Sequence, residues 1–259
     1  MTADERRQQL TEFLARKGFA DLSALVEALE VSESTVRRDL SQLEEEGIVR
    51  RTHGGAVFVS DRFSVLNYAA RESTAVAEKQ AIGKATADLI ADGETVLLDG
   101  GTTTFQVARH LLTRSLQVVT NSLPIANLLS SASNIELIFL GGYIYPRTGV
   151  ALGPLTKQAL ASLNVNKTIM GVAGVTDEGL YNANVLMVEA EEIMMQCAES
   201  VVLVVDHGKF GKRALARLGG LDSVHTVVSD EGLAAEWRDK VERSGTKLII
   251  AASHADAEH

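Results

Sequence analysis

Apolar residues recur at helical spacing through the first part of the chain. They fall three or four positions apart, as they do on one buried face of a helix. Gly18 belongs to the residue type that most often ends helices, while Asp21 and Ser32 are N-cap types. The pattern therefore predicts three short helices, at residues 4–17, 21–30 and 32–46.

The next stretch changes to a strand pattern. Residues 47–59, GIVRRTHGGAVFV, predict two short strands that meet around Thr52–Gly55, where the two glycines permit the positive φ of a tight turn. Three helices followed by a hairpin predict a winged helix-turn-helix domain over residues 1–58.

From residue 78 onward, short runs of Val, Ile and Leu alternate with helical patterns. Such continuous apolar runs are typical of parallel strands covered on both faces, and regular alternation predicts a doubly wound α/β domain over residues 78–252. Residues 59–77 are mixed and alanine-rich, and we expect a linker with some helix. The expected strands are Thr95–Asp99, Gln117–Thr120, Glu136–Leu140, Thr168–Val172, Val201–Val205, Thr226–Ser229 and Lys247–Ile250. The expected helices start near Thr102, Pro124, Gly153, Val185 and Gly232.

Composition narrows the class of protein. The 259 residues are 46% hydrophobic, enough for a large core, and the single cysteine excludes a disulfide within the chain. The first ten residues are polar and lack the apolar core of a signal peptide, and no run approaches the ~18 apolar residues that span a bilayer. We expect a cytoplasmic globular protein without a membrane segment. The six histidines are scattered without ligand spacing, so we expect no metal and no cofactor.

The charge balance excludes broad affinity for polyanions. The formal net charge is −9, and even residues 1–58 hold 8 Lys and Arg against 11 Asp and Glu. Any contact with nucleic acid must therefore come from a small local surface. The stretch SESTVRRDL, residues 32–40, offers one because it places Arg37 and Arg38 side by side.

The third helix presents these arginines on its outer side. At 100° per residue, Val36, Leu40 and Leu43 form a buried stripe, and Ser34 and Arg38 point away from it. Arginine suits a recognition helix because its planar fork binds a guanine edge or a phosphate with two hydrogen bonds. An isolated Arg-Arg pair is more often a solvated helix face. Here a second pair in the hairpin, Arg50-Arg51, accompanies it, so the pattern favours DNA binding.

Polar residues follow the expected strands of the second domain. In DGGTTT, residues 99–104, glycines and threonines lie between a strand and a helix, where backbone N–H groups and the helix dipole can bind a phosphate. An isolated example is as well explained by a strand–turn–helix with a threonine cap. Further polar residues and glycines follow the other strands, and together they suit a phosphorylated, polyhydroxylated small molecule. They are Asn121, Ser122, Gly141, Gly142, Arg147, Asp206, His207 and Lys209.

These motifs also resemble a known family. SESTVRRDLSQLEEEGIVRRTHGGAV is similar to the N-terminal signature of the DeoR family of bacterial transcriptional regulators, and EKQAIGKATADLI, DGGTTT, VVTNS, FLGG and VVDHGKFG resemble its sensor domain. The resemblance implies a third helix in the major groove, a wing on the DNA backbone, and a sensor fold like that of ribose-5-phosphate isomerase and glucosamine-6-phosphate deaminase. It implies DNA contacts at Ser34, Thr35, Arg37, Arg38, Arg51 and His53. It implies a phosphorylated sugar or polyol effector at Asp99, Gly101, Thr102, Thr103, Thr104, Asn121, Ser122, Gly141, Gly142, Arg147, Asp206 and Lys209.

One segment departs from the family pattern. In NVLMVEAEEIMMQCAES, Glu189 is followed by Glu191 and Glu192, where basic residues are common in the family. We expect this difference to alter effector choice or a subunit contact. The methionines and Cys197 of the segment are expected in a core or an interface.

Three functions remain to be compared. The leading one is a repressor of a carbohydrate or polyol catabolic operon that binds double-stranded operator DNA as a homodimer or homotetramer and responds to its effector. The alternative is a sugar-phosphate isomerase or deaminase with an appended DNA-binding domain, using Asp99, Asp206 or His207 as a base. No Lys-Gly-Gly-Gly stretch of the kind found in ribose-5-phosphate isomerases is present. The third function is that of a scaffold protein whose helical domain binds another protein.

Overall fold

The computed structural model divides the chain into two units, Met1–Thr74 and Ala75–His259. They are the N-terminal unit and the C-terminal unit of the chain. The structure describes residues 2–17, 19–45, 48–52, 54–58 and 68–252.

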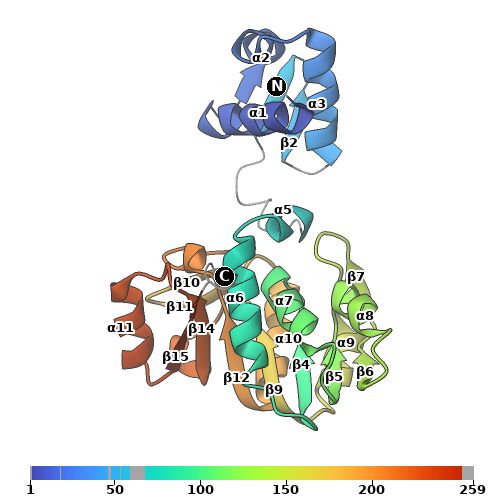
Figure 1. Cartoon of the computed structure of the whole chain (residues 1–259), viewed down its shortest axis with the longest axis vertical. Coiled ribbons are helices and arrows are strands. Elements are labelled where there is room, and N and C mark those ends of the chain that lie inside the picture. The colour runs from blue at the N-terminus through green and yellow to red at the C-terminus, as the bar shows by residue number, and fades with distance from the viewer. Residues whose placement is uncertain (1, 18, 46–47, 53, 59–67, 253–259) are drawn as a thin grey trace, which may run out of the picture. The chain divides into compact units, whose positions relative to one another are not determined.

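Within residues 2–58 of the N-terminal unit, the described residues form three helices and a small sheet (Figure 1). The sheet is antiparallel with the order β1-β3-β2, which completes a winged helix-turn-helix. Its elements are α1 (Ala3–Lys17), β1 (Phe19–Asp21), α2 (Leu22–Leu29), α3 (Glu33–Glu45), β2 (Val49–Thr52) and β3 (Gly55–Phe58). The three predicted helices are confirmed, and the Asp21 side chain caps α2 by accepting a hydrogen bond from the N–H of Ala24 at 2.8 Å.

Strand β1 was not predicted, and it changes the role of one hairpin glycine. It pairs with β3 and sets Ala20 opposite Ala56. A Cβ on Gly55 would lie 2.1 Å from the carbonyl oxygen of Ala20, so this position requires glycine because two backbones approach closely. The hairpin pattern predicts a positive φ for the glycines instead. Three residues next to a helix end carry too little pattern to reveal such a strand.

A seven-stranded parallel sheet is the centre of the C-terminal unit. Its order is β15-β14-β12-β9-β4-β5-β6, and every adjacent pair is parallel. All seven predicted strands are found in it, as β4 (Thr95–Leu98), β5 (Leu116–Thr120), β6 (Ile135–Phe139), β9 (Val165–Met170), β12 (Ala198–Val204), β14 (Thr226–Asp230) and β15 (Lys247–Ala251). The strand order reverses between β4 and β9, which makes this a doubly wound sheet with its switch point there.

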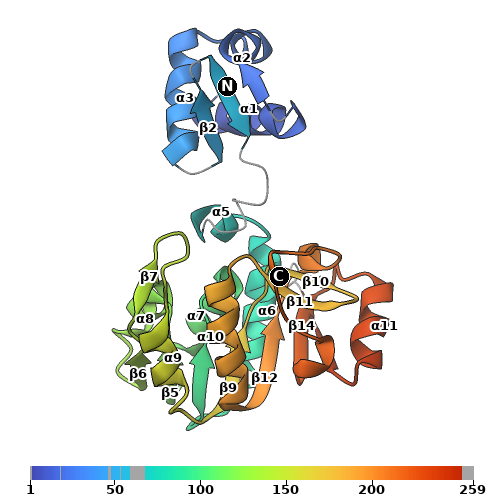
Figure 2. The same ribbon diagram turned by 180° about the vertical axis from the view of Figure 1, so that it is seen from behind.

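Helices cover both faces of this sheet. Val96 and Leu98 of β4 pack into the core beneath α6, α7 and α8, whereas Leu97 between them packs into the core beneath α9 and α10. Figure 1 shows α6 and α7 in front of the sheet, and Figure 2, which is the view from behind, shows α10 in front of it. Alternate residues thus enter opposite cores, which explains the continuous apolar runs. The helices are α6 (Val76–Ala87), α7 (Thr102–Leu111), α8 (Leu123–Leu129), α9 (Pro154–Leu160), α10 (Val185–Gln196) and α11 (Ala235–Arg243).

Several short elements escaped prediction. They have only three or four residues each, which is too short for a periodic pattern to show. A hairpin of β7 (Tyr143–Tyr145) and β8 (Val150–Leu152) follows β6. A second sheet joins β10 (Gly174–Thr176), β11 (Gly179–Asn182) and β13 (Ala216–Gly219), and single turns of 3₁₀ helix lie at η1 (His207–Lys209) and η2 (Leu221–Ser223).

Part of the expected linker lies outside the described residues, namely 59–67. Its described remainder holds a short helix, α5 (Tyr68–Glu72), and the start of α6. None of the described helices is long and apolar enough to cross a membrane.

Candidate nucleic-acid interface and ligand site

The outer face of α3 carries most of the residues predicted to touch DNA. Val36, Leu40 and Leu43 are at most 2% exposed and pack against the rest of the unit, as the stripe predicted. On the other side of the helix, Ser34, Arg37 and Arg38 are exposed, and Thr35 is half-buried. The buried stripe therefore fixes which side of α3 an incoming duplex can meet.

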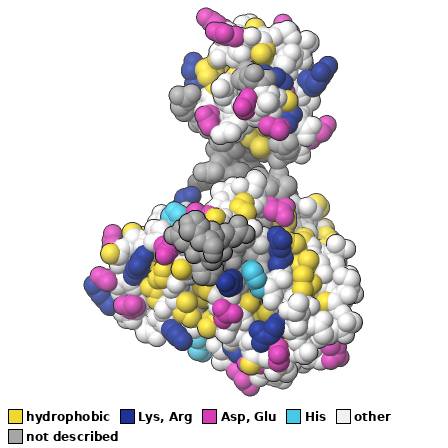
Figure 3. All heavy atoms as spheres, in the orientation of Figure 1, with side chains coloured by type: hydrophobic (Ala, Val, Ile, Leu, Met, Phe, Trp, Pro, Cys, Tyr) yellow, Lys and Arg dark blue, Asp and Glu magenta, His cyan; other side chains and the backbone are white. Residues whose placement is uncertain are grey.

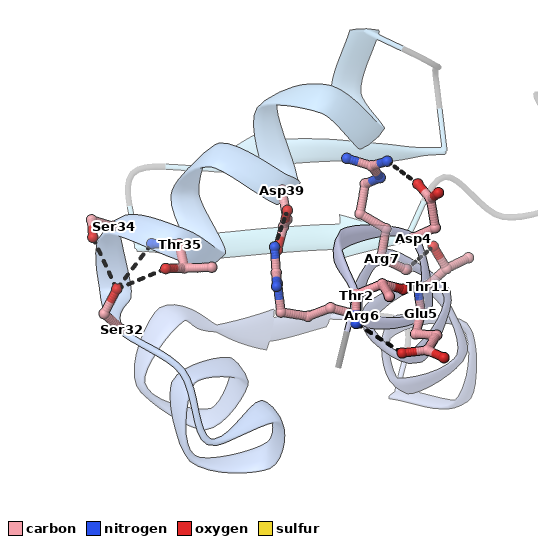
Figure 4. A network of polar contacts seen from close by, with 10 residues as sticks. All are labelled: Thr2, Asp4, Glu5, Arg6, Arg7, Thr11, Ser32, Ser34, Thr35 and Asp39. Atoms are coloured by element: carbon pink, nitrogen blue, oxygen red, sulfur yellow. Dashed lines mark hydrogen bonds and ion pairs between the residues drawn. The ribbon is translucent and has the colours of Figure 1, made fainter.

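Ser32 holds the start of α3 (Figure 4). Its Oγ accepts a hydrogen bond from the N–H of Thr35 at 3.3 Å, and it lies 2.9 Å from the Ser34 hydroxyl and 2.8 Å from that of Thr35. Its carbonyl oxygen accepts from the N–H of Val36 at 3.1 Å. The predicted N-cap is thus confirmed, and it orients two hydroxyls at the end of the helix that recognition helices direct toward bases.

The two arginines of α3 differ in their partners. Arg37 forms an ion pair with Glu33, one turn earlier, with a nitrogen–oxygen distance of 2.7 Å. Both side chains are exposed, so the pair is weak and a phosphate can replace the carboxylate. Arg38 makes no hydrogen bond or ion pair within the described part of the chain. Arg38 is therefore available to a ligand without breaking an existing contact.

The hairpin is tied to α3 through Arg51. Its Nη1 donates to the Ser41 hydroxyl at 2.6 Å, and its backbone N–H donates to Oε1 of Glu44 at 2.8 Å. These bonds hold the exposed Arg51 beside the helix, so both predicted contact surfaces belong to one rigid unit. His53 lies outside the described residues.

An ion pair between the half-buried Arg6 and the buried Asp39 also positions α3, and no pattern in the sequence predicts it. Nε of Arg6 donates to Oδ2 of Asp39 at 2.5 Å and Nη2 donates to Oδ1 at 3.1 Å, which joins α1 to α3 (Figure 4). Asp39 is 3% exposed. The hydrogen bond to this carboxylate raises the pKa of Arg6 above its ordinary value. Only the helical angle of Asp39, beside Val36 and Leu40, could have suggested its burial.

Charged side chains of both signs mix on the molecular surface. Figure 3 shows Lys and Arg side chains interspersed with Asp and Glu over the visible face of each unit. This agrees with the acidic net charge and leaves the exposed arginines of α3 as a local feature.

The predicted ligand residues gather at the carboxyl edge of the parallel sheet. Asp99 follows β4, is 4% exposed, and donates its N–H to the carbonyl of Ile169 at 3.0 Å beside the switch point. Gly101 is the N-cap of α7, and no described side chain caps this helix. Thr104 donates its hydroxyl to the carbonyl of Gly101 at 2.9 Å. The first-turn N–H groups of α7, including those of Thr102 and Thr103, can therefore bind an anion.

The residues after β5 serve mainly as structural connections. The Ser122 hydroxyl caps α8 by accepting from the N–H of Ile125 at 3.5 Å. The amide of Asn121 donates to the carbonyl of Ala151 at 3.1 Å and thereby holds β8, while its Oδ1 is buried without a partner among the described residues. Of these two side chains, Asn121 retains an unused acceptor for a ligand.

The remaining predicted ligand residues follow the strands β6 and β12. Gly142 has φ +153°, and a Cβ there would meet the Thr156 hydroxyl at 2.2 Å, so this glycine is needed for packing. Arg147 lies exposed in the turn between β7 and β8. Asp206 follows β12, four strand spacings from β6. At about 4.8 Å per spacing, the strand ends that carry the predicted set extend over about 19 Å along the edge of the sheet.

A histidine–aspartate pair lies past β12. Nδ1 of His207 is 2.6 Å from Oδ2 of Asp230, and the backbone N–H of His207 donates to Oδ1 of Asp230 at 2.8 Å. These contacts fix the single 3₁₀ turn that carries Lys209, so this side chain projects from an ordered backbone. The pair joins the carboxyl ends of β12 and β14, and no sequence pattern predicts it because the two residues are far apart in the chain.

The unusual acidic segment places one carboxyl in the interior. Glu191 of α10 is 1% exposed, and its Oε1 accepts from Nδ2 of Asn182 at 2.5 Å. Burial, the nearby carboxylate of Asp99 and that of Glu192 raise the pKa of Glu191 well above its ordinary value, against the hydrogen bond from Asn182. Among the described residues, no cluster of three or more His, Cys, Asp or Glu is placed to hold a metal ion.

Both units match models of the same protein family. The family model described as DeoR-like helix-turn-helix domain matches residues 6–62, and the one described as DeoR C terminal sensor domain matches residues 74–231.

Curated relatives match over nearly the whole chain. It is 31% identical over 250 residues to the HTH-type transcriptional repressor GlcR of Bacillus subtilis (strain 168), covering 96% of this chain and 97% of that protein. It is 32% identical over 232 residues to the glycerol-3-phosphate regulon repressor of Escherichia coli (strain K12), covering 89% and 92%. Among solved structures, ribose 5-phosphate isomerase A of Methanocaldococcus jannaschii aligns over 51% of this chain and 53% of that chain, with 18% identity and a TM-score of 0.37, a likeness too slight to carry an inference.

Proposed function

The chain belongs to the DeoR family of transcriptional regulators, and from this premise we propose that it represses a carbohydrate or polyol catabolic operon. It is a DNA-binding regulator, and its relatives are repressors rather than enzymes, so the isomerase or deaminase alternative is not favoured. In the proposed arrangement, residues 1–58 bind operator DNA, residues 78–252 bind a phosphorylated sugar or polyol, and residues 59–77 connect them.

The outer face of α3 supports the DNA-binding part of the proposal. Ser34, Arg37 and Arg38 are exposed opposite a buried stripe, and Arg51 is held beside them by Ser41. A helix of 13 residues with this face outward fits the major groove, where arginine reads guanine. We propose Ser34, Thr35, Arg37, Arg38, Arg51 and His53 as the contact residues.

The contrast between two helix starts supports the effector site. The N-terminus of α8 is capped by Ser122, whereas that of α7 has no described side-chain cap. The open N-terminus of α7 follows Asp99 and Gly100 at the switch point of the sheet, where ligands bind in doubly wound folds. We propose that Gly101, Thr102, Thr103 and Thr104 hold a phosphate there. The remaining contacts of the proposed effector site are Asp99, Asn121, Ser122, Gly141, Gly142, Arg147, Asp206 and Lys209.

Regulation follows from the difference in affinity between two states. A homodimer or homotetramer in the cytoplasm would clamp two operator half-sites, and effector binding would shift the arrangement of the DNA-binding units. The effector changes DNA affinity only to the extent that it binds the two states unequally. The relative named as a glycerol-3-phosphate regulon repressor supports a phosphorylated effector for this chain.

The DNA-binding proposal is tested with DNA selected by the full-length protein from a random-sequence pool. We expect Arg38→Ala to weaken binding by roughly 10- to 100-fold and to lower the slope of log affinity against log salt by about 1. Arg109→Ala is the matched control because Arg109 is an exposed arginine of α7, outside the DNA-binding unit. Fluorescence anisotropy at several salt concentrations measures both. Equal affinity of the Arg38→Ala and Arg109→Ala variants would contradict the proposed contact.

The effector proposal is tested by thermal-shift screening. Sugar and polyol phosphates are compared with their unphosphorylated parents, with inorganic phosphate as a further probe. We expect one phosphorylated compound to raise the melting midpoint while its parent does not, since the open start of α7 binds the phosphate. The same compound should change the affinity of the protein for its selected DNA. A parent that stabilises as well as its phosphate ester would argue against the phosphate site.

A further inference from the structure

Large apolar side chains are exposed around the start of α10. Val185 and Leu186, its first two residues, are 53% and 41% exposed. Leu155, the second residue of α9, is 70% exposed, and Leu215, just before β13, is 77% exposed. These last two are the most exposed large apolar side chains in the part of the chain that the structure describes. None of the four belongs to a buried cluster of the described residues, so packing within one chain does not explain them.

Helix α9 brings its exposed leucine beside α10. The two helices pack against each other, and Figure 2 shows them side by side in front of the sheet. Nζ of Lys157 in α9 lies 2.9 Å from Oε2 of Glu189 in α10. Leu155 is two residues before Lys157, and Leu186 is three residues before Glu189. Both leucines therefore lie at the same level, up to one turn nearer the carboxyl edge than this ion pair.

Strand β13 brings the other exposed leucine to the same place. Ala216 at the start of β13 pairs with Asn182 of β11, three residues before Val185, and β13 also packs against α10. Leu215, which precedes Ala216, therefore lies beside the start of α10 on the side away from α9. The four side chains, Leu155, Leu186, Val185 and Leu215, thus form one surface, the apolar band. Apolar residues that gather in this way on a surface mark an interaction site, whereas single ones do not.

A negative charge lies on one side of the apolar band. Helix α10 runs from the carboxyl edge of the sheet toward its amino edge, because the carbonyl of Cys197, just past its end, accepts from the N–H of Val165 at the start of β9 at 2.9 Å. Glu192 is seven residues into this direction from Val185, which places it about 10 Å from the band. Its side chain is exposed and forms no ion pair with the described residues.

A positive charge lies on the other side of the apolar band. Lys212 belongs to the loop that follows the carboxyl end of β12, and its N–H donates to the carbonyl of Lys209 at 3.4 Å. Its side chain is exposed and also forms no ion pair with the described residues. The neighbouring Arg213 differs because it is paired with Glu178. The band therefore separates one unpaired acidic side chain from one unpaired basic side chain.

This arrangement of charges fits a second copy of the same chain. A two-fold axis through the apolar band places each side of one subunit on the opposite side of the other. Glu192 of each subunit then faces Lys212 of the other, while the apolar side chains pack together between these two pairs. A two-fold interface requires such a self-complementary surface, because the same patch meets itself. A different protein would not require charges of both signs on opposite sides of the band.

We infer that the apolar band is a two-fold interface between two copies of this chain. This inference rests on the homodimer or homotetramer of the proposed function and assigns that assembly to a surface. The band begins at the carboxyl edge of the sheet, where α9 and α10 start and where the proposed effector site lies. A change at that edge on ligand binding would therefore reach the contact between subunits directly.

Sedimentation velocity of the full-length protein over a series of concentrations tests the apolar part. Leu155→Ser and Leu215→Ser together should raise the dissociation constant at least about 100-fold, since burial of one leucine accounts for roughly tenfold and each change is present twice. Leu123→Ser is the control, because Leu123 is 42% exposed at the start of α8, on the other face of the sheet. It should leave the constant within about twofold. Thermal melting shows that each variant folds.

Exchange of the two charges tests the two-fold arrangement. Glu192→Lys places lysines against each other, and Lys212→Glu does the same with glutamates. Each change alone should raise the dissociation constant about tenfold at low salt. Both changes together should restore it to within about threefold of the wild type, because opposite charges then face each other again. Contact with a protein of another kind would give no such restoration.

Each other outcome overturns a distinct statement. A wild-type protein that is monomeric at every concentration would overturn this inference together with the proposed assembly. An oligomer whose dissociation constant is unchanged by the two leucine substitutions would overturn the choice of surface and leave the assembly standing. If the wild type is a tetramer, loss of this interface should leave dimers. Charge changes that have no effect singly, or that are not restored in combination, would overturn the two-fold pairing of Glu192 with Lys212.

Discussion

On α3 the side chains offered to DNA are exposed on a helix whose other face is buried, whereas at the carboxyl edge of the parallel sheet most polar side chains are themselves buried. Arg38 can be removed without disturbing a described contact, but Asn121 and Ser122 each hold a neighbouring element in place. The first surface separates recognition from folding, and the second combines them. Substitutions should therefore act on binding alone on the outer face of α3 and on both properties at the edge of the sheet.

The strongest test of this contrast is Gly100→Ala at the edge of the sheet. A Cβ on Gly100 would lie 1.9 Å from Cγ1 of Val150, a buried β-branched residue that cannot turn away. We expect a loss of about 3 kcal/mol in the stability of the C-terminal unit, the upper range for an overpacked core. Denaturant unfolding, followed by the fluorescence of the single tryptophan, Trp237, measures it.

Two controls sharpen that result. Gly141→Ala makes the same chemical change after β6, where a Cβ meets nothing within 4 Å, and should alter stability by less than about 0.5 kcal/mol. Combining Gly100→Ala with Val150→Ala should cost less than the sum of the single changes, because the second removes the clashing methyl group. Additive costs would show that the clash is relieved by movement elsewhere.

In the N-terminal unit, the largest effect should come from Arg6→Ala. It leaves the carboxylate of Asp39 buried without its bidentate partner, which lowers the melting midpoint of this unit by roughly 5–10 °C. Arg7→Ala is the matched control on the same helix, since Arg7 pairs with the well-exposed Asp4 and such pairs contribute little. Circular dichroism melting measures both. Equal shifts would mean that the Arg6–Asp39 pair does not hold α3 in place.

These cases also show how far the sequence predicts this molecule. Local patterns predicted the stripe of Val36, Leu40 and Leu43 and all seven parallel strands, because helical spacing and continuous apolar runs are both visible within one segment. It did not reveal the Arg6–Asp39 pair or the burial of Glu191, because those depend on which distant segments meet. The predicted ligand residues lie at one edge of the sheet, but their separate roles as caps or open donors became visible only with their partners.

Glu191 gives a smaller, pH-dependent effect. Its pKa is raised by burial, by Asp99 and by Glu192, so the folded chain keeps a proton that the unfolded chain releases above the ordinary value of 4.5. The unfolded state then binds fewer protons, and stability falls as pH rises through this range, by at most about 1.4 kcal/mol per pH unit. Glu191→Gln should remove this fall, and the exposed Glu192→Gln should retain it. Denaturant unfolding between pH 5 and 8 compares the wild type with the Glu191→Gln and Glu192→Gln variants. The same pH dependence of stability in all three would contradict the raised pKa of Glu191.

The smallest effect separates folding from recognition within a single turn of α3. Ser32 caps the helix through the N–H of Thr35, so Ser32→Ala should cost about 1 kcal/mol of stability in the N-terminal unit. Ser34 is also an exposed serine, but its hydroxyl meets only that of Ser32, and Ser34→Ala should change stability by less than about 0.5 kcal/mol while still weakening DNA binding. Thermal melting and anisotropy with selected DNA measure the two properties. If Ser34→Ala destabilised the unit as much as Ser32→Ala, the outer face of α3 would be part of the fold as well, and its contrast with the edge of the sheet would disappear.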